Sequence, residues 1–290
     1  MNTTKLFVLL FLFIGSLYAQ ETVSQAMLSQ ADTSQVFVVK LNDGSSVIGR
    51  INNVTADGFE VETTIGRVAI PYAKAVSAKV IDPTKIRDGY YWFPNPNQTR
   101  LFLAPTGRML KKGNGYFQNI YLFFNGLAYG ITDNVTIGGG MSVFPVDDFL
   151  ENNLFYFTPK FGKEINENVS LAAGAIIINP PNLDEVAGLA YGVGTFGNET
   201  ASFTGGLAFP FAGDDLADQL VIMLGGDLRV SRRTSLISEN WIITGDDGGA
   251  LFAYGIRFFG EQLSVDLAFA NVSDSPIFPG VPYVDFVFNF

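Results

Sequence analysis

The sequence predicts an all-β protein in which a 12-stranded antiparallel transmembrane β-barrel follows a small five-stranded barrel. Composition is the first reason, because 31 glycines and 27 phenylalanines accompany a charged fraction of only 16%, where soluble domains have about a quarter. The second is a hairpin repeat of roughly 33 residues that begins after Thr99. The third is the alternation of large apolar residues with small or polar ones along these hairpins, which is typical of strands that face two environments.

The first segment reads as a secretory signal peptide. Lys5 precedes an apolar run over residues 6–17, and a cleavage site is expected after Ala19. This run is too short to cross a bilayer as a permanent helix. We expect the following division of the chain: signal peptide 1–19, N-terminal segment 20–34, small periplasmic barrel 35–82, linker 83–98 and outer-membrane barrel 99–290.

Residues 35–82 predict five short strands in a meander. The stretch "LNDGSSVIGRI" from Leu41 to Ile51 places an Asn-Asp-Gly turn between two alternating strands. Through this stretch the region resembles an SH3-like or Sm-like closed small barrel. A stabilising module and a partner-docking module both fit the pattern.

The linker 83–98 combines three prolines, which disfavour a regular element, with the aromatic cluster Tyr90 to Phe93. Aromatic side chains of this kind favour the membrane–water interface, but they also pack joints between domains. Both interpretations stay open at the level of sequence.

The barrel region predicts twelve strands separated alternately by short turns and longer loops. Short turns at one end, longer loops at the other and an even strand number are the features of a bacterial outer-membrane barrel. The expected strands are 100–105, 117–130, 134–144, 154–164, 168–178, 186–196, 200–210, 219–230, 235–244, 250–259, 263–271 and 283–290. The chain is then expected to close by pairing its last strand with the strand at 100–105.

The two faces of these strands differ in chemistry. Along 263–271, one parity carries Leu263, Val265 and Leu267, while the other carries small or charged residues. Across the barrel region, Gly, Ala, Ser and Thr dominate the second parity, as in a confined lumen. A soluble β-sandwich is the alternative, but its outer face would be rich in Lys and Glu.

The C-terminal strand carries the resemblance to a known class. The stretch "VPYVDFVFNF" ends with aromatic residues at alternate positions, Phe286, Phe288 and Phe290. It resembles the signal by which the barrel-assembly machinery recognises outer-membrane proteins. The chain as a whole resembles uncharacterised outer-membrane β-barrel proteins of the Bacteroidota. This resemblance implies an outer-membrane location among lipid and lipopolysaccharide, and it supplies no catalytic motif.

Composition excludes several classes of function. The chain has no His and no Cys, which excludes Ser-His-Asp and Cys-His catalysis and the common zinc sites. A net charge of −10 argues against nucleic acid as a partner. The carboxylate pair Asp227 and Asp266 has no spacing that favours acid–base catalysis. We therefore expect neither an enzyme nor a bound cofactor.

Six charged residues fall on the lumen-facing parity and are the candidates for a functional lumen. They fit either a structural network of ion pairs or an ion-selective constriction. The sequence leaves open whether Glu239 faces the lumen or lipid. The six candidates are Lys160, Asp227, Arg229, Arg257, Asp266 and Asp285.

The longer loops are acidic and contain no Lys or Arg, except for the first, at 106–116, which holds Arg108, Lys111 and Lys112. If all six loops gather at one mouth, they would concentrate cations or hold divalent ions that bridge to lipopolysaccharide. The alternative is that these acids only confer solubility. The acidic residues are Asp147, Asp148, Glu151, Asp184, Glu185, Asp214, Asp215, Asp218, Asp246, Asp247 and Asp274.

Two functional hypotheses follow from these features. The first is a narrow channel for small hydrophilic solutes. The second is a non-conducting accessory barrel that docks envelope proteins through residues 35–82. A lumen filled by side chains would favour the second hypothesis.

Overall fold

The computed structural model describes residues 23–29, 32, 34–181, 185–246 and 248–290. The chain divides into two compact units, Met1–Phe93 and Pro94–Phe290. The expected signal peptide, residues 1–19, lies outside the described residues. Among the described residues, no helix has the length and hydropathy needed to cross a membrane.

The first unit contains one antiparallel sheet with the strand order β4-β3-β2-β1-β5. Its strands are β1 (Val36–Leu41), β2 (Ser46–Val54), β3 (Gly58–Thr63), β4 (Gly66–Pro71) and β5 (Ala75–Ile81). The prediction of a closed small barrel is wrong, because β4 and β5 lie at opposite edges of this sheet and do not pair with each other. The 3-10 turn η1 (Tyr72–Lys74) connects them along the chain.

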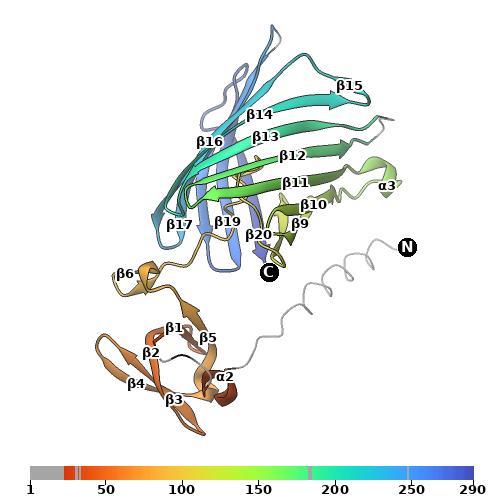
Figure 1. Ribbon diagram of the computed structural model, residues 1–290. Helices are drawn as coiled ribbons and strands as arrows, with labels where there is room; N and C mark the ends of the chain where they lie inside the picture. Colours follow the sequence, from red (N-terminus) through yellow and green to blue (C-terminus); the bar gives the residue numbers. More distant parts are fainter. Residues whose placement is uncertain (1–22, 30–31, 33, 182–184, 247) are drawn as a thin grey trace. The chain divides into compact units, whose positions relative to one another are not determined.

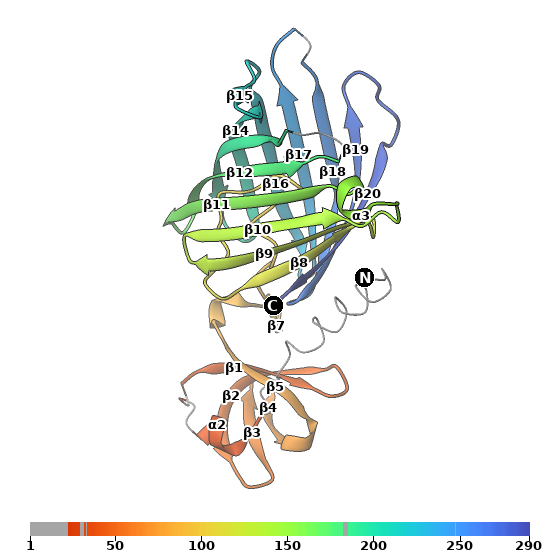
Figure 2. The same ribbon diagram turned by 90° about the vertical axis from the view of Figure 1, so that its right-hand side faces the viewer.

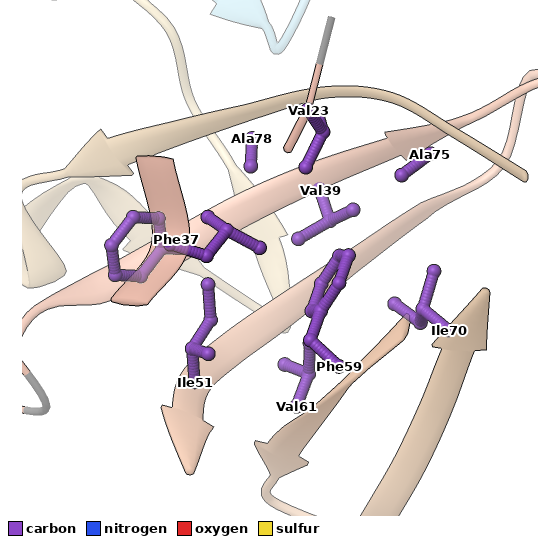
Figure 3. Close-up of a cluster of buried hydrophobic side chains, with 10 residues drawn as sticks. Val23, Phe37, Val39, Ile51, Phe59, Val61, Ile70, Ala75 and Ala78 are labelled. Atoms are coloured by element: carbon purple, nitrogen blue, oxygen red, sulfur yellow. The ribbon is translucent and has the colours of Figure 1, made fainter. Parts of the chain in front are cut away.

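The core of this unit explains why the sheet need not close. Phe37, Val39 and Phe59 are almost fully buried on one face of the sheet. Val23 and Leu28, the latter in the short helix α2 (Gln25–Ser29), join the same cluster (Figure 3). The N-terminal segment thus covers apolar surface that a closed barrel would bury between its own strands.

The expected linker contains short regular elements. Asp82 caps the 3-10 turn η2 (Pro83–Lys85), in which Pro83 occupies the first position, a place that proline tolerates. Two short strands follow and pair with each other, β6 (Ile86–Arg87) and β7 (Tyr90–Tyr91). The guanidinium of Arg87 lies 4.7 Å from the ring centroid of Trp92.

The second unit is a closed antiparallel barrel of twelve strands (Figures 1 and 2). Each strand pairs with its neighbour in sequence, β13 pairs with β14, and β20 pairs with β8. The strands are β8 (Gly115–Ile120), β9 (Phe124–Thr132), β10 (Val135–Ser142), β11 (Phe155–Asn166), β12 (Val169–Asn179), β13 (Ala187–Gly197), β14 (Ala201–Ala212), β16 (Val221–Ser231), β17 (Thr234–Ile243), β18 (Ala250–Phe259), β19 (Leu263–Val272) and β20 (Val281–Asn289).

The strand number is as predicted, but the first strands differ. Residues 100–105 form no strand, and the single strand expected at 117–130 is the hairpin β8–β9. Tyr121 and Leu122 form its turn with positive φ angles of 52° and 68°. Non-glycine residues seldom adopt this conformation, so the continuous apolar run gave no sign of a turn. The prediction that the last strand pairs around residues 99–105 is therefore wrong.

The barrel wall separates an apolar exterior from an interior of polar and small side chains. On β19, Leu263 and Leu267 are 52% and 45% exposed, whereas Asp266 is 0% exposed. The same alternation runs through β18 and β20, where Phe252 and Phe286 point outward. A closed wall of this kind leaves no backbone edge unpaired, as the hydrocarbon of a membrane requires.

The connections divide the barrel into two ends. We call the end with the short connections 133–134, 167–168, 198–200, 232–233 and 260–262 the turn end. At the other end, the loop end, lie 121–123, 143–154, 180–186, 213–220, 244–249 and 273–280, which include the short helix α3 (Phe149–Asn152) and the two-residue strand β15 (Asp215–Leu216). The expected first loop, 106–116, is not at the loop end, because it precedes β8 and does not connect two strands there.

Candidate functional site in the barrel lumen

Residues 95–110, which we call the plug segment, run inside the barrel (Figures 1 and 2). Asn97 is 0% exposed and Phe102 is 1% exposed. The segment turns back on itself through an isolated bridge between Arg100 and Pro105. Its prolines lack the amide hydrogen that a central strand needs, so the segment occupies the lumen instead of extending the wall.

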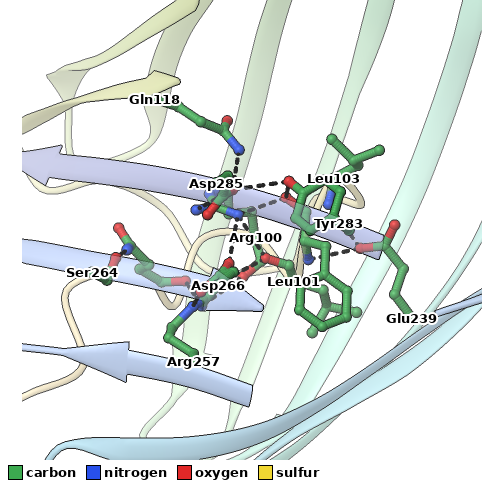
Figure 4. A network of polar contacts seen from close by, with 12 residues as sticks. Arg100, Leu101, Leu103, Gln118, Glu239, Arg257, Ser264, Asp266, Tyr283 and Asp285 are labelled. Atoms are coloured by element: carbon green, nitrogen blue, oxygen red, sulfur yellow. Dashed lines mark hydrogen bonds and ion pairs between the residues drawn. The ribbon is translucent and has the colours of Figure 1, made fainter. Parts of the chain in front are cut away.

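A buried cluster of charges joins the plug segment to the wall (Figure 4). On the wall, Nε of Arg257 lies 2.7 Å from Oδ1 of Asp266, and both side chains are fully buried. From the plug, Arg100 lies 3.3 Å from Asp266 and 3.1 Å from Asp285. Burial works to lower the pKa of Arg100, but the carboxylates of Asp285 and Asp266 raise it above its usual range. The guanidinium therefore stays charged in the lumen.

The same wall residues bind the backbone of the plug. Arg257 donates to the carbonyl oxygens of Asn97 at 2.9 Å and Leu101 at 2.5 Å. Asp285 also accepts hydrogen bonds from Gln118 of β8 and Tyr283 of β20. Each charged group thus has several partners, which is what makes a buried charge tolerable.

Glu239 faces the lumen and holds the tip of the plug segment. Its Oε2 accepts hydrogen bonds from three consecutive backbone amides, those of Phe102, Leu103 and Ala104, at 2.8–2.9 Å. Its Oε1 accepts a hydrogen bond from the indole of Trp241 at 2.8 Å. The carboxylate is 1% exposed and sits in a concave group of amides of the kind that binds anions.

Outside this cluster, the plug segment makes further polar contacts with the wall. Lys160 donates to the carbonyl oxygens of Thr99 at 3.1 Å and Arg108 at 2.7 Å. Asp227 accepts from the amide of Asn95 at 2.9 Å. Arg108 donates to the carbonyl oxygens of Gly197 and Asn198, and burial lowers the pKa of this arginine.

Five of the six charged candidates therefore contact the plug segment. The sixth, Arg229, donates to the carbonyl oxygens of Ser231 and Arg232 in its own turn, and its guanidinium lies 5.0 Å from the ring centroid of Phe259. The structure brings Arg257, Asp266 and Asp285 into one cluster and leaves Arg229 outside it.

Where glycines face the lumen, the wall lies close against the plug segment. A Cβ added at Gly225 would lie 2.3 Å from Cδ1 of Leu101, and one added at Gly162 would lie 2.7 Å from Sδ of Met109. At Gly130 it would lie 2.4 Å from the carbonyl oxygen of Lys111. Glycine at these wall positions therefore makes room for the entering chain.

The acidic loop residues that the structure describes are exposed at the loop end. Asp184 and Asp247 lie outside the described residues. In the described part of the chain, no three acidic side chains come together as a ligand set for a metal ion. Arg108 and Lys111, expected at this mouth, lie instead in and beside the plug segment, and Lys111 pairs with Glu164 near the turn end.

Sequence reasoning missed the plug segment and the role of its Arg100, and it left open whether Glu239 faces the lumen. The stretch from Arg100 to Ala104 reads as an apolar strand, which hides its position in the lumen. Pro105 at its end and Gly107 shortly after it are the signals against a strand.

The C-terminal aromatic residues lie on the barrel wall. Phe286 is 44% exposed on the outside, and the ring of Phe290 lies against Gly115.

No protein-family model matches the chain, and no curated protein matches its sequence. Among solved structures it is similar to the KdgM porin, with 9% identity and a TM-score of 0.43 over 61% of this chain and 95% of that one. It is also similar to a loop L8 deletion mutant of OmpT, an outer membrane protein of Vibrio cholerae, with 12% identity and a TM-score of 0.33 over 88% of this chain and 96% of that one. These values carry no argument about a substrate. The strand pairing and the chemistry of the wall make the chain a closed, 12-stranded antiparallel barrel of the outer-membrane type.

Proposed function

We propose that the protein is a gated outer-membrane channel whose lumen is closed by its own plug segment and opens when that segment leaves. The observation that carries this proposal is that the plug contributes no strand to the barrel, which closes through the pairing of β20 with β8. The wall can therefore persist without the plug.

The chemistry of the contacts supports a reversible plug. The groups that the plug binds on the turn side of the lumen are carboxylates, guanidinium groups and carbonyls, which water can solvate once the segment is gone. The route so exposed would carry Lys160, Arg257, Asp266 and Asp285, with charges of both signs. Such a lining suits a small hydrophilic solute.

The same proposal places the barrel in the outer membrane. The exposed apolar band would face outer-membrane lipid and lipopolysaccharide, and β20 with the following Phe290 would be recognised by the barrel-assembly machinery. We assign no catalytic role to the lumen, because the chain contains neither His nor Cys to act as base or nucleophile.

A non-conducting accessory barrel is the second candidate. Arg257, Asp266 and Asp285 are each 0% exposed, and such burial favours a plug that stays in place. Among the described residues of the first unit, β4 and β5 each pair with one strand, so each has an edge to which a partner protein could add a strand.

Conductance in planar bilayers separates the two candidates. Because the chain has no cysteine, the variant Asn97→Cys with Ser264→Cys would create the only disulfide, at a position where these side chains are hydrogen-bonded across the plug and the wall. We expect brief openings in the natural protein, none in the oxidised variant, and their return after reduction. The single variant Asn97→Cys is the matched control.

Replacement of residues 95–110 by a flexible Gly-Ser linker should give a permanently open channel. An absence of openings in the natural and the reduced proteins, together with an open linker variant, would establish a permanent plug and the accessory role. A closed linker variant with a folded barrel would show that the plug segment is not what closes the lumen.

A further inference from the structure

The loop side of the lumen has an apolar wall, which a channel for hydrophilic solutes does not need. Two buried apolar clusters line the barrel interior, and Trp241 packs against both of them. One cluster comprises Leu101, Phe102, Ala104, Ile237, Ala253, Ala268 and Tyr283. The other comprises Ala172, Tyr191, Val193, Ala208, Val221 and Met223.

Apart from Met109 of the plug segment, the partly buried side chains that pack against these clusters lie toward the loop end. On β12, Ile176 is nearer the loop end than the buried Ala172, and on β13 Leu189 is nearer than Tyr191. Trp241 is likewise beyond Ile237 on β17. Since these side chains have the inward parity, their exposed surface must face the lumen. We call the surface formed by Ile120, Ile176, Leu189, Trp241 and Ala270 the apolar vestibule.

The plug segment adds an apolar group to this region. Leu103 is 54% exposed, although its neighbours Phe102 and Ala104 are buried. Its amide is one of the three bound by Glu239, two residues from Trp241 along β17. Leu103 therefore presents an exposed apolar side chain at the depth where the vestibule begins.

The charge around this region has one sign. The loops that surround the mouth, 143–154, 180–186, 213–220, 244–249 and 273–280, contain acidic residues and no Lys or Arg. On the inward parity at the depth of the vestibule, the charged wall groups among the described residues are two carboxylates. Glu239 is bound by the plug amides and Trp241, and Asp285, which is opposite Ile120 in register, is bound by Arg100 of the plug. An anion entering from the loop end would thus meet repulsion and no cationic partner.

We propose that the apolar vestibule binds a hydrophobic small molecule that carries no negative charge, with hydrophobic cations preferred. Apolar lumen surface in contact with water gains free energy when such a molecule covers it, and the acidic mouth raises the local concentration of cations. This site needs no movement of the plug and is independent of the proposed gating.

The fluorescence of Trp241 offers a local readout. The chain has two tryptophans, so the variant Trp92→Phe leaves Trp241 as the sole indole. The probes are tetraphenylphosphonium and tetraphenylborate, which have nearly the same shape and opposite charge. We expect saturable quenching of Trp241 by the cation, weaker at high salt, and no saturable quenching by the anion.

Variants locate the site. Ile176→Ala with Leu189→Ala should weaken the binding of tetraphenylphosphonium by about tenfold, because each truncation removes apolar contact area. Leu103→Ala, which leaves every strand unchanged, should weaken it several-fold and does not depend on wall folding. The matched control is Leu171→Ala on the outer face of β12, where Leu171 is 48% exposed.

The outcomes are distinct. Quenching that rises without saturation and equally for both probes would show partition into detergent or lipid and overturn the proposal. Saturable quenching that the lumen variants leave unchanged would also overturn it. The binding measurement is made with the plug segment in place, so a failure of gating in bilayers would not affect its result. A failure of binding would refute the vestibule and would have no bearing on the gate.

Discussion

The two halves of the lumen differ in the chemistry of their walls. On the turn side, the wall carries charged groups, and the plug segment supplies partners for five of the six predicted ones. On the loop side, the wall is apolar and partly exposed, and among the described residues only Leu103 of the plug adds exposed apolar surface to it. A charge in a confined lumen requires a partner, whereas an apolar surface can stay open to water at a smaller cost.

This difference shows which groups the lumen charges bind when the plug segment is in place. Arg257, Asp266 and Asp285 bind a segment of the same chain, so in this state they are not a free constriction for ions. The two halves can therefore be altered separately. A variant of the charged groups that bind the plug should release it, and a variant of the apolar vestibule residues should leave it in place.

Arg257→Leu should have the largest effect on the plug. The change leaves Asp266 buried with Arg100 as its remaining cation and removes the donors to the carbonyls of Asn97 and Leu101. Removal of one partner of a buried ion pair costs about 3–5 kcal/mol. The readout is maleimide labelling of Ala104→Cys, a position that is 2% exposed with the plug in place, and labelling should accelerate by roughly two to four orders of magnitude.

Arg229→Leu is the matched control for this experiment. Arg229 is also a buried arginine of the wall, but it donates hydrogen bonds to the carbonyl oxygens of Ser231 and Arg232 in its own turn. It should leave the labelling of Ala104→Cys near the natural rate. Equal acceleration in both variants would mean that loss of barrel stability, and not release of the plug, controls labelling.

Gly107→Ala should have the next largest effect. An added Cβ would lie 2.2 Å from the carbonyl oxygen of Ser170 and 2.9 Å from the backbone nitrogen of Thr195, and neither strand atom can move freely. Overpacking of this kind costs about 1–3 kcal/mol. Gly192→Ala, where an added Cβ meets nothing within 4 Å, is the control. Labelling that is unchanged by Gly107→Ala would contradict the close seating of the plug against β12 and β13.

The sequence predicts the outer surface of the barrel better than its interior contents. The alternation along β18, β19 and β20 follows from lipid on one side and a lumen on the other, a constraint that acts on every strand and repeats in every hairpin. The strand number and the turn end could be read from that repeat. The closure between β20 and β8 could not, because the turn at Tyr121 and Leu122 has no glycine or proline to mark it.

The plug segment escaped prediction for a related reason. Residues 100–104 are apolar enough to pass as a strand, and their burial in the lumen depends on partners far away in sequence, such as Glu239 and Arg257. Local periodicity carries no information about such partners. The prediction that the small sheet closes into a barrel failed for the same reason. Val23 and Leu28, which cover its core, lie outside the segment from which the barrel was inferred.

Glu239→Gln tests the tip of the plug. An amide oxygen can still accept from the amides of Phe102, Leu103 and Ala104, but the bonds lose their charge assistance. We expect a loss of about 1–2 kcal/mol in plug docking and a roughly tenfold rise in the labelling of a cysteine at Thr106. Glu239→Ala, which removes the acceptor altogether, should exceed this effect. If the two variants label at the natural rate, Glu239 does not hold the tip.

Lys111→Ala should have the smallest effect, although it also breaks an ion pair beside the plug. Lys111 lies 3.1 Å from Glu164, but the two side chains are 60% and 55% exposed. Water and salt screen such a pair, which typically contributes less than about 1 kcal/mol. Labelling of Ala104→Cys should change less than about fivefold and should lose even this difference in high salt. Lys111 and Arg257 both lie close to a carboxylate, and they differ in the burial of their ion pairs. A large, salt-independent acceleration would therefore mean that an exposed ion pair holds the plug as firmly as a buried one.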